Sequence, residues 1–143
     1  MHGHRYTIEF RILGAAVDPA AITEELGLQP SRVWLPGSRR GDGEFRAGMW
    51  GYNGAEETDS HEIDWDTLEQ GLEFVLDRLW PHKEVIALYQ AGARAIWWCG
   101  HFQEVFDGGP RLSPSLLKRL GEFGVELSID NYFSPTHAST HEV

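Results

Sequence analysis

Three things are scarce in this sequence: cysteine, basic residues and long apolar runs. The 143 residues include a single cysteine, Cys99, which excludes an internal disulfide and suits a reducing compartment. No apolar run approaches the ~20 residues that a membrane-spanning helix needs. Residues 1–5 lack the apolar segment of a secretory signal. We therefore expect a cytoplasmic protein without a membrane partner.

Basic residues number 12 against 22 acidic ones, so the formal net charge is −10. This charge disfavours non-specific binding to nucleic acid or anionic lipid, because both are polyanions. It permits a basic protein partner, and it also keeps a protein soluble. The charge therefore argues against a nucleic-acid-binding protein without identifying a partner.

Recognisable metal and phosphate motifs are absent too. The sequence has no G-x-x-x-x-G-K-[ST] loop, no H-E-x-x-H helix and no paired cysteines. An oxygen-rich stretch around His61, residues 59–64, lacks the spacing of a calcium-binding loop. We therefore predict no metal site and no cofactor.

The sequence does contain two similar segments, residues 18–27 and 113–121. Each begins with an N-cap residue and a proline, continues as a short amphipathic stretch and ends in Leu-Gly. Each predicts a short helix between strands. The strands are indicated by residues 5–13 and 125–133, in which apolar and polar side chains alternate.

These elements predict a ferredoxin-like α+β sandwich. We expect a mostly antiparallel sheet of four to five strands, with helices packed on one face and two pseudo-repeated β-α-β units. A single domain over residues 1–133 is predicted, followed by a disordered polar tail, 134–143. The remaining elements are a hairpin, a long helix capped by Asp64 and a strand apolar on both faces, over 32–52, 64–79 and 93–102.

Several of these segments resemble one family. The run Asp18-Pro19-x-x-Ile22, continued by Leu26-Gly27-Leu28 and Pro30-Ser31, is similar to the start of a bacterial family catalogued as a domain of unknown function (family 4279). Arg40-Gly41 stands where such families often show Lys-Gly. The resemblance implies a small stand-alone bacterial domain with no established activity, so no catalytic residue is carried over. Further matches within residues 5–133 are Trp50, Leu112-Ser113, Leu120-Gly121 and Leu127-Ser128-Ile129-Asp130-x-Tyr132.

One candidate site is the face of the predicted sheet that the helices leave open. Aromatic rings mixed with a few polar groups are typical of a binding site. The same patch could instead be covered core or a self-association surface, and the sequence leaves these alternatives open. If the first, penultimate and last strands are neighbours, the side chains on this face are Glu9, Arg11, Trp97, Cys99, His101, Ser128, Asp130 and Tyr132.

The arginine-rich hairpin is a second candidate site. Guanidinium groups match phosphate and carboxylate, so the hairpin could bind a small anion beside an aromatic wall. Alternatively, its arginines pair with the acidic segment 56–77 or solubilise the turn. The residues of this candidate are Arg32, Trp34, Arg39, Arg40, Trp50 and Tyr52.

A thiol site is the third candidate. Cys99 and His101 lie two residues apart on a strand, so both side chains point to the same side, and a thiolate needs such a neighbour. Asp130 is the only acidic group worth testing with them. Against this interpretation, a buried free cysteine behaves as a small hydrophobe.

We therefore rank a non-catalytic binding or interaction domain first. An acidic domain with six tryptophans could self-associate as a homodimer, or hold a basic protein partner as immunity-type or scaffold proteins do. A domain for a small anionic ligand at the hairpin ranks second. A thiol-dependent enzyme at Cys99 and His101 ranks third.

Overall fold

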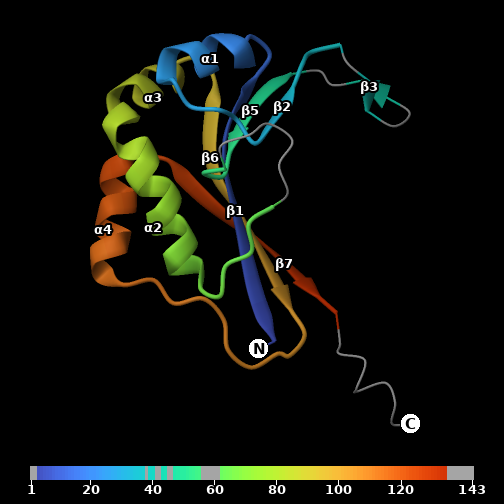
Figure 1. Cartoon of the computed structure of the whole chain (residues 1–143), viewed down its shortest axis with the longest axis vertical. Helices are drawn as coiled ribbons and strands as arrows, with labels where there is room; N and C mark the ends of the chain where they lie inside the picture. Colours follow the sequence, from blue (N-terminus) through green and yellow to red (C-terminus); the bar gives the residue numbers. More distant parts are fainter. Residues whose placement is uncertain (1–2, 38, 41–42, 45–46, 56–61, 135–143) are drawn as a thin grey trace.

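Strand β1 occupies the centre of a five-stranded sheet whose order is β2-β5-β1-β6-β7 (Figure 1). The computed structural model describes residues 3–37, 39–40, 43–44, 47–55 and 62–134, so the predicted tail beyond Ser134 lies outside the described residues. The strands of this sheet are β1 (His4–Gly14), β2 (Arg32–Trp34), β5 (Gly48–Tyr52), β6 (Arg94–Gln103) and β7 (Glu126–Phe133). A separate two-stranded sheet pairs β3 (Arg39–Arg40) with β4 (Gly43–Glu44).

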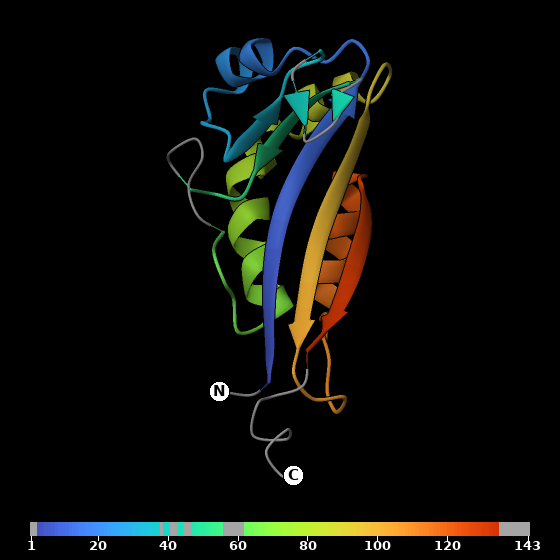
Figure 2. The same cartoon turned by 90° about the vertical axis from the view of Figure 1, so that its right-hand side faces the viewer.

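All helices pack on one face of the main sheet, and Figure 2 looks onto the other face, here called the open face. No helix in the described part of the chain is long and apolar enough to cross a membrane. The helices are α1 (Pro19–Leu26), α2 (Leu68–Leu79), a 3₁₀ turn (Trp80–His82), α3 (Lys83–Tyr89) and α4 (Pro114–Phe123).

The predicted α+β class is confirmed, but the sheet is mixed. β1 is antiparallel to both β5 and β6, whereas β6 is parallel to β7. β2 is antiparallel to β5 and therefore runs parallel to β1, so β1-α1-β2 is a β-α-β unit with β5 between its strands. The second unit, β6-α4-β7, has adjacent strands, which departs from the split units of a ferredoxin-like sandwich.

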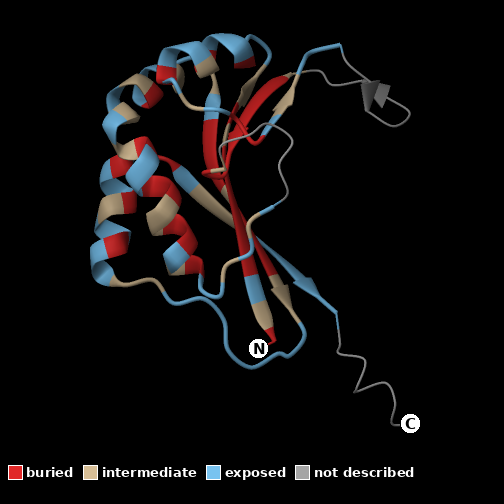
Figure 3. Cartoon of the chain, viewed as in Figure 1, coloured by how far each residue is buried: buried red, intermediate tan, exposed pale blue. Residues whose placement is uncertain are grey.

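The core lies between the sheet and the helices (Figure 3). β1 contributes every second residue to it, as the alternation predicts, and α2 packs directly on β1. The middle of β1 is also buried on its open face, where Thr7 is 3% and Glu9 8% exposed. The polar side chains of β1 are therefore not all exposed to solvent, although the alternation suggests that they would be. The largest fully buried core side chains include Phe10, Ile12, Trp50, Leu72, Leu76 and Trp97.

The predicted helix caps are only partly confirmed. Asp18 and Ser113 cap α1 and α4 through their side-chain oxygens, as expected. α2 begins later than predicted, because Trp65 pairs its backbone with Tyr6 at 2.8 and 2.9 Å and Thr67, rather than Asp64, becomes the N-cap. α4 continues past Gly121 and ends at the left-handed Gly124, φ 81°.

Two helical glycines offer a matched test of this packing. In α2, a Cβ added to Gly71 would lie 2.1 Å from Ile8 Cδ1 and 2.7 Å from Trp65 Cδ1. In α4, a Cβ added to Gly121 would meet nothing within 4 Å.

We expect Gly71→Ala to lower the free energy of unfolding by about 1–3 kcal/mol, because overpacking outweighs the helix preference of alanine. Gly121→Ala is the control and should raise it by about 0.5–1 kcal/mol, because only the helix preference changes. Urea denaturation of both variants measures the difference. Equal effects of the two substitutions would contradict close packing of α2 on β1.

Candidate functional site

The open face does not carry the β6 residues that the sequence analysis placed there. Trp97 pairs with Phe10, Cys99 with Ile8 and His101 with Tyr6, so these three β6 side chains face the helices. Trp97 and Cys99 are 0% exposed and His101 3%. The predicted face was wrong because β6 is apolar on both sides, so its alternation does not say which side faces the core.

The neighbouring β6 residues face the open side instead. Trp98 lies opposite Glu9 of β1, and its indole Nε1 donates to Asp130 Oδ2 of β7 at 2.7 Å. The guanidinium of Arg11 lies over the Trp98 ring, with Cζ 4.7 Å from the ring centroid. Of the residues predicted for this face, Glu9, Arg11 and Asp130 are therefore placed together around Trp98, and Ser128 and Tyr132 follow the same side of β7.

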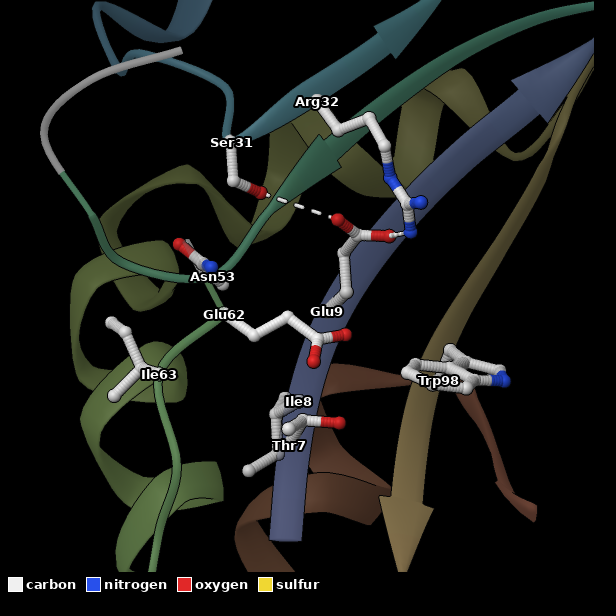
Figure 4. Close-up of a pocket in the computed structure, with 9 residues that line it drawn as sticks. All are labelled: Thr7, Ile8, Glu9, Ser31, Arg32, Asn53, Glu62, Ile63 and Trp98. Atoms are coloured by element: carbon white, nitrogen blue, oxygen red, sulfur yellow. Dashed lines mark hydrogen bonds and ion pairs between the residues drawn. The ribbon is translucent and has the colours of Figure 1, made fainter. Parts of the chain in front are cut away.

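The carboxylate of Glu9 is the central polar group of this face (Figure 4). Its Oε1 accepts hydrogen bonds from Arg11 Nε and Arg32 Nη2, both at 2.7 Å. Its Oε2 accepts from Ser31 Oγ at a longer 3.3 Å. A Cβ added to Gly51 on β5 would lie 2.9 Å from Glu9 Cδ, so glycine at this position leaves room for the carboxylate. Two cations thus compensate one buried anion.

A small cleft, here called the polar cleft, opens beside this ion pair. Its volume is about 110 Å³, the space of three or four water molecules at about 30 Å³ each. Thr7 lines it, and the Thr7 hydroxyl is buried with no hydrogen-bond partner among the described residues. The residues around the cleft are Thr7, Ile8, Glu9, Ser31, Arg32, Asn53, Glu62, Ile63 and Trp98.

The guanidinium of Arg32 interacts with both carboxylates that line the cleft, those of Glu9 and Glu62. Its hydrogen bond to Glu9 is the largest cause that raises the pKa of Arg32 above its ordinary value, and the carboxylate of Glu62 adds to the effect. The side chain of Arg32 is 47% exposed, whereas that of Glu9 is 10% exposed. Arg32 therefore remains charged and forms part of the solvent-facing rim.

The predicted arginine-rich hairpin site is only partly assembled. Arg32 reaches the polar cleft, and Trp34 shares the open face with it. The aromatic wall is not formed: Trp50 is 0% exposed, faces the helices and donates from Nε1 to Thr23 Oγ1 at 2.9 Å. Tyr52 stacks on Trp50 with a centroid distance of 5.6 Å. The side chains of Arg39 and Arg40 lie outside the described residues.

The three residues of the thiol candidate do not come together in the structure. Burial raises the pKa of the Cys99 thiol to about 12, so the thiol stays protonated at neutral pH. Asp130 lies on the opposite face of the sheet from Cys99 and His101, so the proposed three-residue group is not assembled. No group of three or more His, Cys, Asp or Glu side chains that could hold a metal occurs among the described residues. Residues 59 and 61 of the oxygen-rich stretch lie outside them.

Comparison with known proteins gives a family but no activity. The model of a family described as a domain of unknown function, DUF4279, matches residues 4–134. The chain belongs to this family. No curated protein and no solved structure matches the chain. The resemblance expected from the sequence is therefore confirmed, and the role of this DUF4279 domain has to be argued from its site.

The apolar lining residues Ile8, Ile63 and Trp98 were not among the predicted site residues, nor were four polar ones: Thr7, Ser31, Asn53 and Glu62. Their signal in the sequence is weak, because single polar residues in strands and loops are common. The most informative feature was Glu9, an acidic residue in the middle of a strand whose polar and apolar side chains alternate. A buried carboxylate requires cationic partners, and that requirement identifies the surrounding cluster once the sheet order is known.

Cys99 provides a direct test of the buried thiol in this DUF4279 domain. With a pKa of about 12, the thiol holds roughly a thousandfold less thiolate at about pH 8 than an unfolded cysteine does. We expect iodoacetamide to label Cys99 very slowly in the native protein and rapidly in urea, as measured by mass spectrometry. Labelling of the native protein as fast as in urea would contradict the burial of the thiol and support the thiol candidate.

Proposed function

We propose that this DUF4279 domain is a non-catalytic binding domain whose site is the polar cleft on the open face of the sheet. The ligand we propose is small and polar, because the cleft is small and three of its polar residues, Thr7, Glu9 and Arg32, lie on strands of the sheet. This proposal replaces the predicted hairpin site while keeping Arg32 as a rim residue.

The observation that carries the proposal is the unpaired hydroxyl of Thr7. A hydroxyl buried without a partner costs about 1–3 kcal/mol, and unpaired buried polar groups are rare in native proteins. Thr7 is 3% exposed and is one of the residues that line the cleft. A Cβ added to Gly100 on β6 would lie 2.7 Å from Thr7 Oγ1. Any side chain larger than that of glycine at position 100 would therefore clash with the Thr7 hydroxyl.

Binding rather than catalysis is supported by the chemistry of the cleft. A nucleophilic site needs an activated group with a base in reach. Cys99, the one thiol of the chain, lies on the opposite face and stays protonated. The charged groups at the cleft hold one another instead: the carboxylate of Glu9 accepts from two guanidinium groups.

Thr7→Val tests the proposal because its two expected effects have opposite signs. Valine removes the unpaired hydroxyl at nearly equal volume. In urea denaturation, the free energy of unfolding of the unliganded protein should therefore rise by about 1 kcal/mol. Binding should weaken. The probes are ethylamine, acetate, glycine and urea, and the measurement is the shift of the Thr7 and Gly100 backbone amide signals in NMR titrations.

Thr23→Val is the matched control, because Thr23 Oγ1 accepts from Trp50 Nε1. That substitution should destabilise the protein by about 1 kcal/mol and leave probe binding unchanged. If no probe shifts the Thr7 and Gly100 signals of the unmodified protein, the proposed site is wrong.

Self-association is a second candidate, favoured by an exposed aromatic pair at the end of edge strand β7. Phe106 and Phe133 stack with centroids 4.2 Å apart, and they are 79% and 43% exposed. Within the described part of the chain, β7 pairs only with β6, so its other edge can accept a strand from a second copy.

We expect a concentration-dependent dimer in sedimentation experiments, and we expect Phe106→Asp to shift it to monomer. Leu88→Asp is the control, since Leu88 is 75% exposed on α3, remote in sequence from β7. A monomer at all concentrations, or equal loss in both variants, would count against this candidate.

A further inference from the structure

We propose that His4 and His101 form a two-proton switch that holds the β6–α4 loop, residues 104–113, at the end of the sheet. One proton added to the neutral pair leaves the loop held, and a second proton releases it. The two histidines lie on the helix side of the sheet, so the switch goes beyond the proposed binding function and does not depend on the polar cleft.

A chain of three hydrogen-bond contacts runs through the two imidazole rings. His4 Nε2 lies 2.6 Å from the backbone oxygen of Asp107, and His4 Nδ1 lies 2.9 Å from His101 Nε2. His101 Nδ1 lies 2.7 Å from Asn131 Oδ1. His101 is 3% exposed and stacks on Tyr6, with ring centroids 4.7 Å apart. The pair therefore connects β1, β6, β7 and the loop that follows β6.

The β6–α4 loop passes close to the start of β1 (Figure 1). The backbone N–H of Glu104 donates to the oxygen of Gly3 at 2.7 Å. Gly108 has a φ of 92°, and a Cβ added to it would lie 3.1 Å from His4 Nε2. A residue other than glycine would be strained at this φ and would press on the imidazole. The path of the loop is therefore fitted to the ring of His4.

Counting protons gives the charge of the pair. A backbone oxygen only accepts, so His4 Nε2 carries a proton. With the Asn131 oxygen toward His101, Nδ1 of His101 also carries a proton, and the contact between the two rings needs a third. Two neutral imidazoles carry two protons in total. The arrangement in the structure therefore has one positive charge.

Asn131 permits the neutral pair to keep the same contacts. When its amide group is turned round, its N–H donates to His101 Nδ1, and each ring then donates from Nε2 toward the loop. Asn131 is exposed on the edge strand β7, so its other amide atom meets solvent in both orientations. The first proton therefore changes the charge of the pair without breaking the chain of contacts.

A second proton breaks the contact between the rings. His4 Nδ1 and His101 Nε2 then both carry hydrogens and face each other at 2.9 Å. Two donors form no hydrogen bond, and like charges repel at this distance. His101 is buried beside Tyr6, whereas His4 is only partly buried. His4 is therefore the ring that moves, and its bond to Asp107 in the loop is lost.

The charged groups around the pair are mostly acidic. Burial raises the pKa of Tyr6 above its ordinary value, so the phenol stays neutral. From β7, the side chains on the helix side are uncharged: Leu127, Ile129, Asn131 and Phe133. The charged residues that share a cleft with His4 are Arg5, Asp64, Asp66 and Glu104, and Asp107 lies in the loop. Those that share a cleft with Tyr6 are Asp66, Glu69, Glu73 and Arg111. These carboxylates can compensate one positive charge on the pair.

The test follows the protein by NMR between about pH 8 and about pH 4, the range in which histidine binds its proton. The imidazole signals of His4 and His101 report the two protons, and the backbone amide signals of Glu104 and Gly108 report the loop. We expect two separate steps, because the rings are coupled. The loop signals should shift in the second step and not in the first. His4→Gln should abolish the loop shift.

Asn131→Asp tests the role of the amide. A carboxylate only accepts, so it holds the proton on His101 Nδ1, and the first step should move to higher pH by about one unit. Lys118→Gln is the matched control, since Lys118 is exposed on α4 and the substitution changes the net charge equally. It should leave the first step nearly unchanged. His82→Gln is the control for His4→Gln, because His82 lies in the 3₁₀ turn after α2, and it should keep the loop shift.

Three results would overturn the switch. The loop signals might move together with the first proton, or they might still move in His4→Gln. In either case His4 would not be the group that holds the loop. Loss of the α2 amide signals at the pH of the loop shift would also overturn the switch, because the acid would then unfold the domain rather than release one loop.

Discussion

The open face of this domain depends on one buried carboxylate. Glu9 lies in the middle of the central strand, and a carboxylate there is stable only while cations hold it. Arg11 comes from the same strand and Arg32 from the edge strand β2. Because breaking such a pair leaves an uncompensated charge at a cost of about 3 kcal/mol or more, the ion pair links the edge of the sheet to its centre.

The other features of the open face follow from accommodating this group. Glycine is needed at position 51, because a Cβ there would lie 2.9 Å from the carboxyl carbon. The hydroxyl of Ser31 lies within hydrogen-bond distance of both Glu9 Oε2 and the Gly51 carbonyl. Trp98 lies opposite Glu9 on β6, with the guanidinium of Arg11 over its ring. The polar cleft is the space that remains between these groups and residues 62–63.

Local features of the fold could be predicted from the sequence, whereas features that depend on distant residues could not. The caps of α1 and α4 were predictable, because an N-cap bonds within its own turn. The start of α2 was not, because the bridge between Trp65 and Tyr6 joins segments far apart in the chain. The face of Trp97 was not either, since a strand apolar on both sides carries no signal of its orientation.

The site was harder to predict than the fold for a related reason. Arg11 was predicted for the open face and Arg32 for an anion site at the hairpin, but both guanidinium groups donate to Glu9 of the chain itself. Recognising this pairing requires the sheet register, because Arg11 of β1 and Arg32 of β2 both lie opposite Gly51 of β5.

Stability alone does not account for the residue at position 7. An apolar β-branched side chain would fill the same volume in β1 without burying a hydroxyl that lacks a partner. Proteins retain such unfavourable groups mainly where function requires them, because substitutions that relieve the cost are easily found. Thr7 lies on the most central strand of the sheet, with Glu9 two residues further along the same face. Thr7 is therefore a position whose side chain the packing of the sheet alone does not explain.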